Sequence, residues 1–147
     1  MSTRGLLSFH FQGQNYVTYN HSDSYPKALG AWICLFAQEH LNSKASIKSF
    51  GQKLQALEWV DGFGQRDTAQ LQGGALLEAI AKGKVQRIAR DNRAFRLCMD
   101  CEFAYILDLD KDVMEFWDLV AGEQVETFTL DSLSLCAVDV MECERRH

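Results

Sequence analysis

Hydrophobic and polar residues alternate along residues 6–11, where Leu7, Phe9 and Phe11 share one side of an extended chain. This period of two predicts a half-buried strand. Residues 15–20 are rich in Tyr, Val and Thr and predict a second strand. The Gln-Gly-Gln sequence between them suits a turn, because glycine tolerates a positive φ. The start of the chain therefore predicts a β-hairpin.

Three stretches in the middle of the chain have the spacing of amphipathic helices. The first covers residues 26–42, begins with a proline that suits a first helical turn, and has an apolar stripe that includes Trp32. We expect this stripe to pack on the sheet. Apolar residues between 47 and 57 predict a second helix, and those between 71 and 80 a third. Residues 67–70 resemble a capping box at the start of the third helix.

Strands return near the end of the chain. Residues 103–109, 113–119 and 125–130 read as strands joined by short turns, which is a β-meander. Residues 144–147 are expected to fray. Strands at both ends with helices between them predict one α+β domain spanning residues 1–147. We expect an antiparallel sheet, formed by the N-terminal hairpin and the C-terminal three-stranded meander, covered by helices from the middle of the chain.

Charge is unevenly distributed along the chain. The net charge is −5, which disfavours wrapping of nucleic acid, because such binding needs many Lys and Arg contacts to phosphates. Residues 84–96 nevertheless form a basic block, and residues 100–131 are predominantly acidic. We expect the basic block to be helical and either to pair with the acidic region or to contact a partner or a phosphate. The candidate contact residues are Lys84, Arg87, Arg90 and Arg93.

The five cysteines and the absence of a long apolar run indicate a cytoplasmic protein with reduced thiols. No run approaches the roughly 18 apolar residues of a membrane span. Cys98 and Cys101 form a C-x-x-C pair that could be half of a zinc site or a redox pair. The second ligand pair of a zinc site is missing, and the pair precedes a strand rather than following one. We therefore expect buried thiols there, with no metal and no cofactor.

The junction between the hairpin and the first helix gathers the most reactive side chains, His21, Asp23 and Tyr25. Arg4 opens the first strand, and an antiparallel hairpin brings that end beside the end of the second strand. Together the four residues could hold a small anionic ligand, with Arg4 as a bidentate fork. They could also move a proton, with Asp23 orienting His21. The alternative is a structural network in which Asp23 caps the following helix.

Established catalytic motifs give little support for an enzyme. There is no P-loop, G-x-S-x-G, H-E-x-x-H or dinucleotide-binding fingerprint. Removal of Met1 would expose Ser2, whose α-amine and hydroxyl match the start of N-terminal-nucleophile hydrolases. The chain is short for that class. Whether this protein is an enzyme therefore stays open at the level of sequence.

Three segments combine unusual residues at fixed spacing: a Thr-Arg-Gly start at residues 3–5, a Tyr-x-His-x-Asp-x-Tyr-Pro motif at residues 19–26, and the Glu-Phe-Ala-Tyr-Ile strand at residues 102–106. Together they resemble a family of small, uncharacterised bacteriophage and prophage proteins. The resemblance covers both ends of the chain and leaves residues 42–97 unmatched. At position 22 the chain has Ser where the family commonly has an aromatic residue.

The resemblance implies an accessory protein that acts in the cytoplasm of a bacterial host. We therefore expect a protein that binds a host component, such as a defence complex that it would inhibit. The alternative is a small-molecule or nucleotide binder, or a hydrolase, that uses Arg4, His21, Asp23 and Tyr25. Neither function requires a membrane or a nucleic-acid partner.

Overall fold

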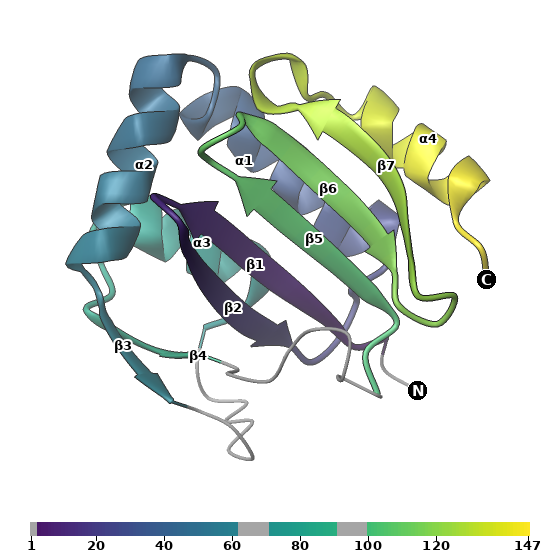
Figure 1. Cartoon of the computed structure of the whole chain (residues 1–147), viewed down its shortest axis with the longest axis horizontal. Coiled ribbons are helices and arrows are strands. Elements are labelled where there is room, and N and C mark those ends of the chain that lie inside the picture. Colours follow the sequence, from purple (N-terminus) through teal and green to yellow (C-terminus); the bar gives the residue numbers. More distant parts are fainter. Residues whose placement is uncertain (1–2, 62–70, 91–99) are drawn as a thin grey trace.

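The computed structural model describes residues 3–61, 71–90 and 100–147. Its central feature is a five-stranded sheet with the strand order β2-β1-β5-β6-β7 (Figure 1). The strands are β1 (Gly5–Phe11), β2 (Gln14–Asn20), β5 (Phe103–Asp108), β6 (Val113–Asp118) and β7 (Glu123–Thr129). The predicted α+β class is confirmed, with the N-terminal hairpin and the C-terminal meander lying side by side.

The predicted hairpin is formed by β1 and β2, which pair in the antiparallel direction. Its two-residue loop has positive φ at both positions, 49° at Gln12 and 76° at Gly13. Two positive φ angles define a type I′ turn, whose twist matches that of the flanking strands. Both loop N–H groups donate to the carboxylate of Asp110, at 2.8 and 3.2 Å. The hairpin is therefore tied to the turn that follows β5.

The expectation of an entirely antiparallel sheet is wrong at its centre, where β1 and β5 are parallel. Gly5 lies opposite Phe103 and His10 lies opposite Asp108. The helices that follow β2 return the chain to the end of the sheet at which β1 begins, so β5 enters in the same direction as β1. The Glu102 N–H donates to the Arg4 carbonyl at 2.8 Å and extends this pairing before the strands begin.

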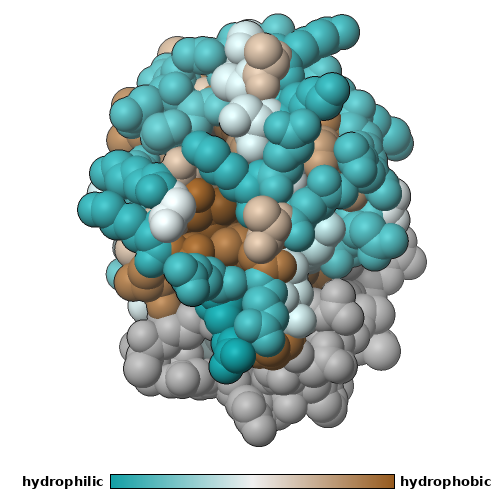
Figure 2. All heavy atoms as spheres, turned by 90° about the vertical axis from the view of Figure 1, so that its left-hand side faces the viewer, coloured by the Kyte–Doolittle hydropathy of each residue, from teal (hydrophilic) through white to brown (hydrophobic). Residues whose placement is uncertain are grey.

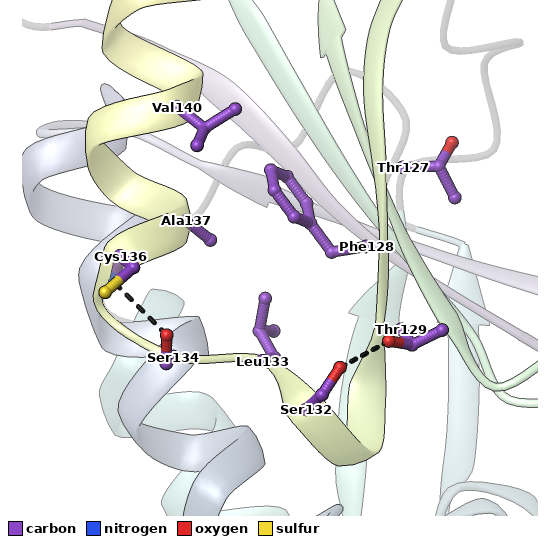
Figure 3. A pocket seen from close by; sticks show the side chains of 9 residues that line it. All are labelled: Thr127, Phe128, Thr129, Ser132, Leu133, Ser134, Cys136, Ala137 and Val140. Carbon is purple, nitrogen blue, oxygen red and sulfur yellow. Dashed lines mark hydrogen bonds between the residues drawn. The ribbon is translucent and has the colours of Figure 1, made fainter.

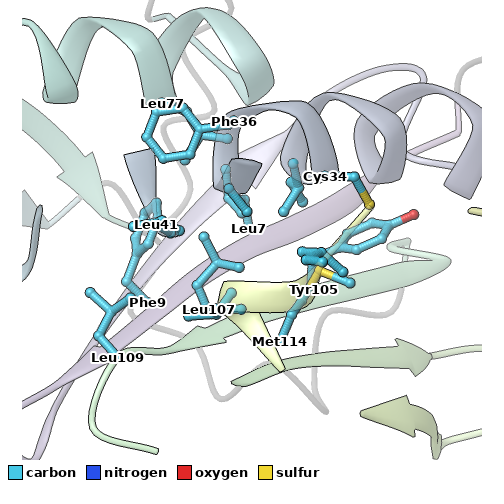
Figure 4. Packing of buried hydrophobic residues seen from close by; sticks show 14 of the residues in the cluster. Leu7, Phe9, Cys34, Phe36, Leu41, Leu77, Tyr105, Leu107, Leu109 and Met114 are labelled. Carbon is cyan, nitrogen blue, oxygen red and sulfur yellow. The ribbon is translucent and has the colours of Figure 1, made fainter. Parts of the chain in front are cut away.

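The helices pack against the sheet (Figure 1). They are η1 (Pro26–Gly30, a π-helical turn), α1 (Ala31–His40), α2 (Lys44–Ala56), α3 (Gly73–Ala81), the 3-10 turn η3 (Leu130–Ser132) and α4 (Cys136–Glu144). Figure 4 shows Leu7 and Leu107 of the sheet packed with Phe36 and Leu41. Burying each side chain of this size contributes about 1.5–3 kcal/mol. Within the described residues, no helix has the length and apolar character that crossing a bilayer requires.

The predicted first helix is confirmed over η1 and α1, but one residue of its expected stripe is not buried. Ile33 and Phe36 are buried, whereas Trp32 is 58% exposed. The indole lies against the backbone of Gly74 in α3, where a Cβ atom would come within 2.8 Å of the ring. Trp32 therefore covers the contact between α1 and α3 rather than facing the sheet.

A capping box that the sequence interpretation overlooked begins α2. The Ser46 N–H donates to the Ser43 hydroxyl at 3.1 Å, and the Ser43 N–H donates to the Ser46 hydroxyl at 3.0 Å. These bonds satisfy two N–H groups that the first turn of a helix leaves free. The capping box predicted at residues 67–70 lies outside the described residues.

Replacing Ser43 by Ala is expected to lower the free energy of unfolding by about 1 kcal/mol, because the cap is lost. For a chain of this size the melting temperature should fall by roughly 3 °C, as measured by circular dichroism. Ser49→Ala is the matched control, since Ser49 is exposed within the same helix. A Ser43→Ala protein that melts no earlier than the Ser49→Ala protein would show that the box adds nothing to stability.

The expectation that the basic block is helical is also wrong. Residues Arg87–Arg90 form β4, which pairs in parallel with β3 (Glu58–Asp61) in a second, two-stranded sheet. Within β4, Arg87 is exposed and Ile88 is fully buried. The three-residue spacing of basic side chains suggested a helix, but the buried position of Ile88 and the partner strand β3 decide the conformation.

The cysteines differ from the expectation of reduced, buried thiols. Cys101 is buried but takes part in a disulfide, which corrects that expectation. Cys98 lies outside the described residues. Cys34 is free and buried, and its burial raises the pKa of the thiol to about 12, so it stays protonated. Cys136 and Cys143 are free and exposed.

The end of the chain does not fray as expected, because it is anchored on Asp118. The Asp118 side chain is fully buried and accepts the Ala121 N–H, the Arg146 N–H and a bond from the His147 ring. The imidazole of His147 also stacks on Phe103, with 4.9 Å between the ring centres. A buried carboxylate needs such partners, and the last residues of the chain supply two of them.

Candidate functional site

The four residues predicted to form a ligand site are not joined to one another. Within the described part of the chain, no hydrogen bond or ion pair links any two of Arg4, His21, Asp23 and Tyr25. The start of β1 does lie beside the end of β2, as expected, with Gly5 opposite Asn20. The backbone register is therefore as predicted, but the four side chains do not bond to one another.

Each of the four side chains has its own surroundings. Arg4 pairs with Asp100 at 3.8 Å. The His21 ring nitrogen Nδ1 shares a hydrogen bond with the Tyr19 hydroxyl at 3.1 Å, and the backbone N–H of His21 donates to the Gln72 side chain at 2.6 Å. Asp23 is exposed, with a φ of 56°, and Tyr25 packs on the core. Asp23 does not cap the following helix, because the N-cap residue of η1 is Tyr25 and no side chain caps this helix.

The polar network at this junction is built from other residues. Ser24 is fully buried, and its hydroxyl accepts a bond from the Asn20 amide at 2.8 Å. The Ser24 carbonyl accepts the hydroxyl of Tyr105 at 2.7 Å, and the Ser24 N–H donates to the Thr3 carbonyl at 3.0 Å. These bonds join the start of the chain, the hairpin and β5. Their arrangement fits the alternative in which the junction is a structural network rather than a ligand site.

A cavity of about 340 Å³ lies beside this network. Asp23 is the member of the predicted set that lines it, together with Trp32 of α1 and Gly73 of α3. Gly73 has a φ of 58°, and a Cβ there would lie 3.0 Å from the Asn20 side chain. The cavity therefore brings together β2, η1, α1 and α3, but one of the four candidate residues lines it.

The basic candidates are partly used within the protein. Arg87 forms two bonds to the Glu58 carboxylate, at 3.1 and 3.3 Å, across the β3–β4 pair. Lys84 is exposed. Arg93 and the side chain of Arg90 lie outside the described part of the molecule.

The face of the molecule that carries α2 is hydrophilic around a small hydrophobic hollow (Figure 2).

A cluster of one histidine and two carboxylates lies at the ends of β1 and β5. His10 contacts Asn15 at 2.6 Å and Asp110 at 3.3 Å. The oxygens of Asp110 accept the two loop N–H groups of the hairpin, and these bonds lower the pKa of Asp110. One oxygen of Asp108 accepts the N–H groups of the next two turn residues. Backbone donors thus occupy these carboxylates, and the cluster clamps two turns together.

A groove of about 440 Å³ separates β7 from α4. Figure 3 shows Phe128 of β7 directed towards Val140 and Ala137 of α4, with Leu133 below them. Val140 is 39% exposed, so part of this apolar lining reaches solvent. The sequence interpretation missed the groove because α4 has a weak apolar pattern. The signal that could have found it is the apolar spacing of Ala137, Val140 and Met141.

Comparisons with known proteins add no relative: no family model matches the chain, and searches of curated proteins and of solved structures found no match. The function must therefore be inferred from the geometry of the molecule.

Proposed function

We propose that this protein acts by binding another protein, whose extended, basic and apolar segment docks along the edge of β7 over the groove against α4. The observation that carries this proposal is the groove itself, an apolar hollow between a helix and an edge strand (Figure 3). Recognition of this kind, in which a segment adds to the edge of a sheet, combines main-chain hydrogen bonds with side-chain pockets.

The position of β7 supports strand addition. It is the last strand in the order of the five-stranded sheet, with β6 as its neighbour. The Thr127 N–H donates to the adjacent Glu126 carboxylate at 3.1 Å rather than to a strand. An edge strand offers such groups to an incoming segment, and an exposed carboxylate is easily displaced. The partner would thus gain backbone bonds without breaking the sheet.

The charge around the groove indicates the chemistry of the partner. Residues 120–144 include no Lys, Arg or His. Their acidic residues are Glu123, Glu126, Asp131, Asp139, Glu142 and Glu144. Glu123 and Glu142 already pair with Arg146 and Arg145. A segment that alternates basic and apolar residues would place its apolar side chains in the groove and its basic side chains beside the remaining carboxylates. Complementary charge of this kind mainly raises the association rate and the specificity.

The alternative function, a small-ligand binder or hydrolase at the junction, requires Arg4, His21, Asp23 and Tyr25 to converge. Their separate surroundings therefore favour the protein-binding proposal. The resemblance to phage proteins makes a protein of the bacterial host the first partner to test. Inhibition of a host defence complex is the activity that we propose such binding would serve.

Binding of a short peptide tests the docking geometry. We expect an eight-residue peptide that alternates Lys and Val to bind saturably in fluorescence anisotropy. Val140→Lys should weaken this binding at least about tenfold, because the new side chain occupies the groove and repels the peptide. Val120→Lys is the matched control, since Val120 is 62% exposed and lies outside the groove lining, so the new lysine adds the same charge away from the groove. It should change the affinity less than about twofold.

Two further peptides separate strand addition from simple charge attraction. A Glu–Val peptide of the same length should not bind. The Lys–Val peptide with a central proline, which cannot complete the backbone pairing, should bind at least about tenfold more weakly. Equal loss in the two lysine variants, or equal binding of the proline peptide, would contradict docking along β7. In bacterial cells, a photocrosslinking residue at Thr127 should capture a partner that the same residue at Val120 does not.

A further inference from the structure

The imidazole of His40 presents an unusual buried atom. His40 is the last residue of α1, and its Nε2 atom is inaccessible to solvent and has no hydrogen-bond partner in the described structure. Buried polar atoms almost always have a partner, and an orphan of this kind calls for an ion, a water molecule or a functional role. The neighbours of Nε2 indicate which group would serve as its partner.

Two carboxylates face this nitrogen. The oxygens of Glu39 and Glu78 each lie 3.7 Å from Nε2. This distance is too long for a direct hydrogen bond. It is close to the separation of about 3.4 Å between two ligand atoms that share a tetrahedral zinc ion with bonds near 2.1 Å. The three ligand atoms lie within 4.8 Å of one another.

We propose that Glu39, His40 and Glu78 bind a divalent transition-metal ion of the zinc type, with solvent water completing its coordination. One imidazole nitrogen and two carboxylate oxygens form a donor set that suits such ions. The site is independent of the groove between β7 and α4, and neither proposal rests on the other.

The elements around the site hold the ligands in place. Glu39 and His40 come from the last turn of α1, and Glu78 comes from α3. The Phe36 ring lies 4.7 Å from the imidazole ring, at an angle of 33°, and orients it. The C-terminal end of a helix carries a partial negative charge, which favours a cation there. The Glu39 side chain is 70% exposed, so the carboxylate side of the cluster borders solvent although Nε2 itself is buried.

Lys82 is the competing cation. Its ammonium group lies 3.5 Å from the same Glu78 oxygen, and its side chain is 55% exposed. An exposed ion pair of this kind is weak, so a metal ion can displace it. Removing this lysine charge should therefore strengthen metal binding, whereas a purely structural role of the cluster predicts no such gain.

The test uses the full-length chain carrying Cys136→Ser and Cys143→Ser, because both thiols are free and exposed and could bind zinc themselves. Isothermal titration with Zn²⁺ should show one equivalent bound. Titration with Co²⁺ should give the visible absorption of a four-coordinate ion. His40→Gln and Glu78→Gln should each weaken binding at least about tenfold, and Lys82→Gln should strengthen it.

His10→Gln is the matched control, because His10 also lies beside two carboxylates, but backbone N–H groups already bind their oxygens. It should leave the affinity unchanged. Circular dichroism of each variant shows whether it folds. If the His40→Gln protein does not fold, the Glu78→Gln protein still tests the proposal. Absence of binding, or binding that survives both ligand substitutions, overturns the proposal. Loss on His10→Gln alone would place the ion at the other cluster.

Discussion

The Gly5→Ala substitution is expected to lower the free energy of unfolding by about 3 kcal/mol, because the added methyl group overpacks a closed site. A Cβ atom at Gly5 would lie 2.6 Å from the Ser24 Cβ and 2.8 Å from the Phe103 carbonyl oxygen. Neither neighbour can move freely, since Ser24 is bonded into the junction and Phe103 lies in β5. The melting temperature should fall by roughly 9 °C.

Two further proteins test the cause of this loss. Gly30→Ala is the matched control, because its Cβ would meet the flexible end of Met141 at 3.1 Å. That substitution should change stability by less than about 1 kcal/mol. In a Gly5→Ala, Ser24→Gly protein the contact with Ser24 disappears while the contact with Phe103 remains. The double variant should therefore lose less stability than the sum of the single variants. Strict additivity would exclude a clash with Ser24.

Asp118 is expected to produce the second large effect. Asp118→Ala should lower the free energy of unfolding by about 3 kcal/mol, because the Ala121 and Arg146 N–H groups and the His147 ring lose a buried acceptor. Burial acts to raise the pKa of Asp118, but these hydrogen bonds outweigh it and lower the pKa below its ordinary value of 3.8. Urea denaturation at pH 7 measures the loss.

The same carboxylate predicts a pH dependence. Because the pKa is lower in the folded state, the stabilisation is present above pH 3.8, the ordinary value, and is lost as the pH falls through the folded pKa. The difference in stability between the wild-type and Asp118→Asn proteins that is measured at about pH 5 should therefore shrink as the pH falls below about pH 4. Asp131→Asn, at an exposed position, should show a small difference throughout. A difference that persists undiminished at pH 2 would exclude this linkage.

The two proposals can be tested independently of each other. The groove between β7 and α4 predicts a protein partner with a basic and apolar segment, and Val140 tests it. The cluster of Glu39, His40 and Glu78 predicts metal binding that peptide binding does not require. A protein that binds zinc but no peptide would retain the second proposal and exclude the first, and the reverse result would do the opposite.

Much of the local structure could be predicted because its signal lies between residues close in the sequence. Alternation along residues 6–11 and 103–109 indicated strands, and helical spacing between residues 47 and 57 indicated α2. Each pattern reflects burial of one face, which is the main free-energy term. The basic block misled the prediction, because three-residue charge spacing does not determine a conformation that a partner strand can override.

The candidate site was predicted less well, because side chains choose partners by distance in space. Arg4 was expected near His21, and the hairpin register does bring their backbones together. The Arg4 side chain nevertheless pairs with Asp100, which lies about two thirds of the way along the chain. Likewise, Ser24 is held by Tyr105, which enters the junction through the parallel strand β5. Pattern within a single segment cannot reveal such contacts.

The sequence by itself determined the hairpin, the main helices, the meander and the α+β class, since local periodicity and turn chemistry suffice for them. The tertiary structure alone decided the parallel pairing of β1 with β5, the conformation of β4 and the anchoring of His147 on Asp118. It also decided that His40 faces Glu78 and that β7 and α4 enclose a groove. The physical reason is that these features depend on which surfaces meet when several elements bury their apolar faces together.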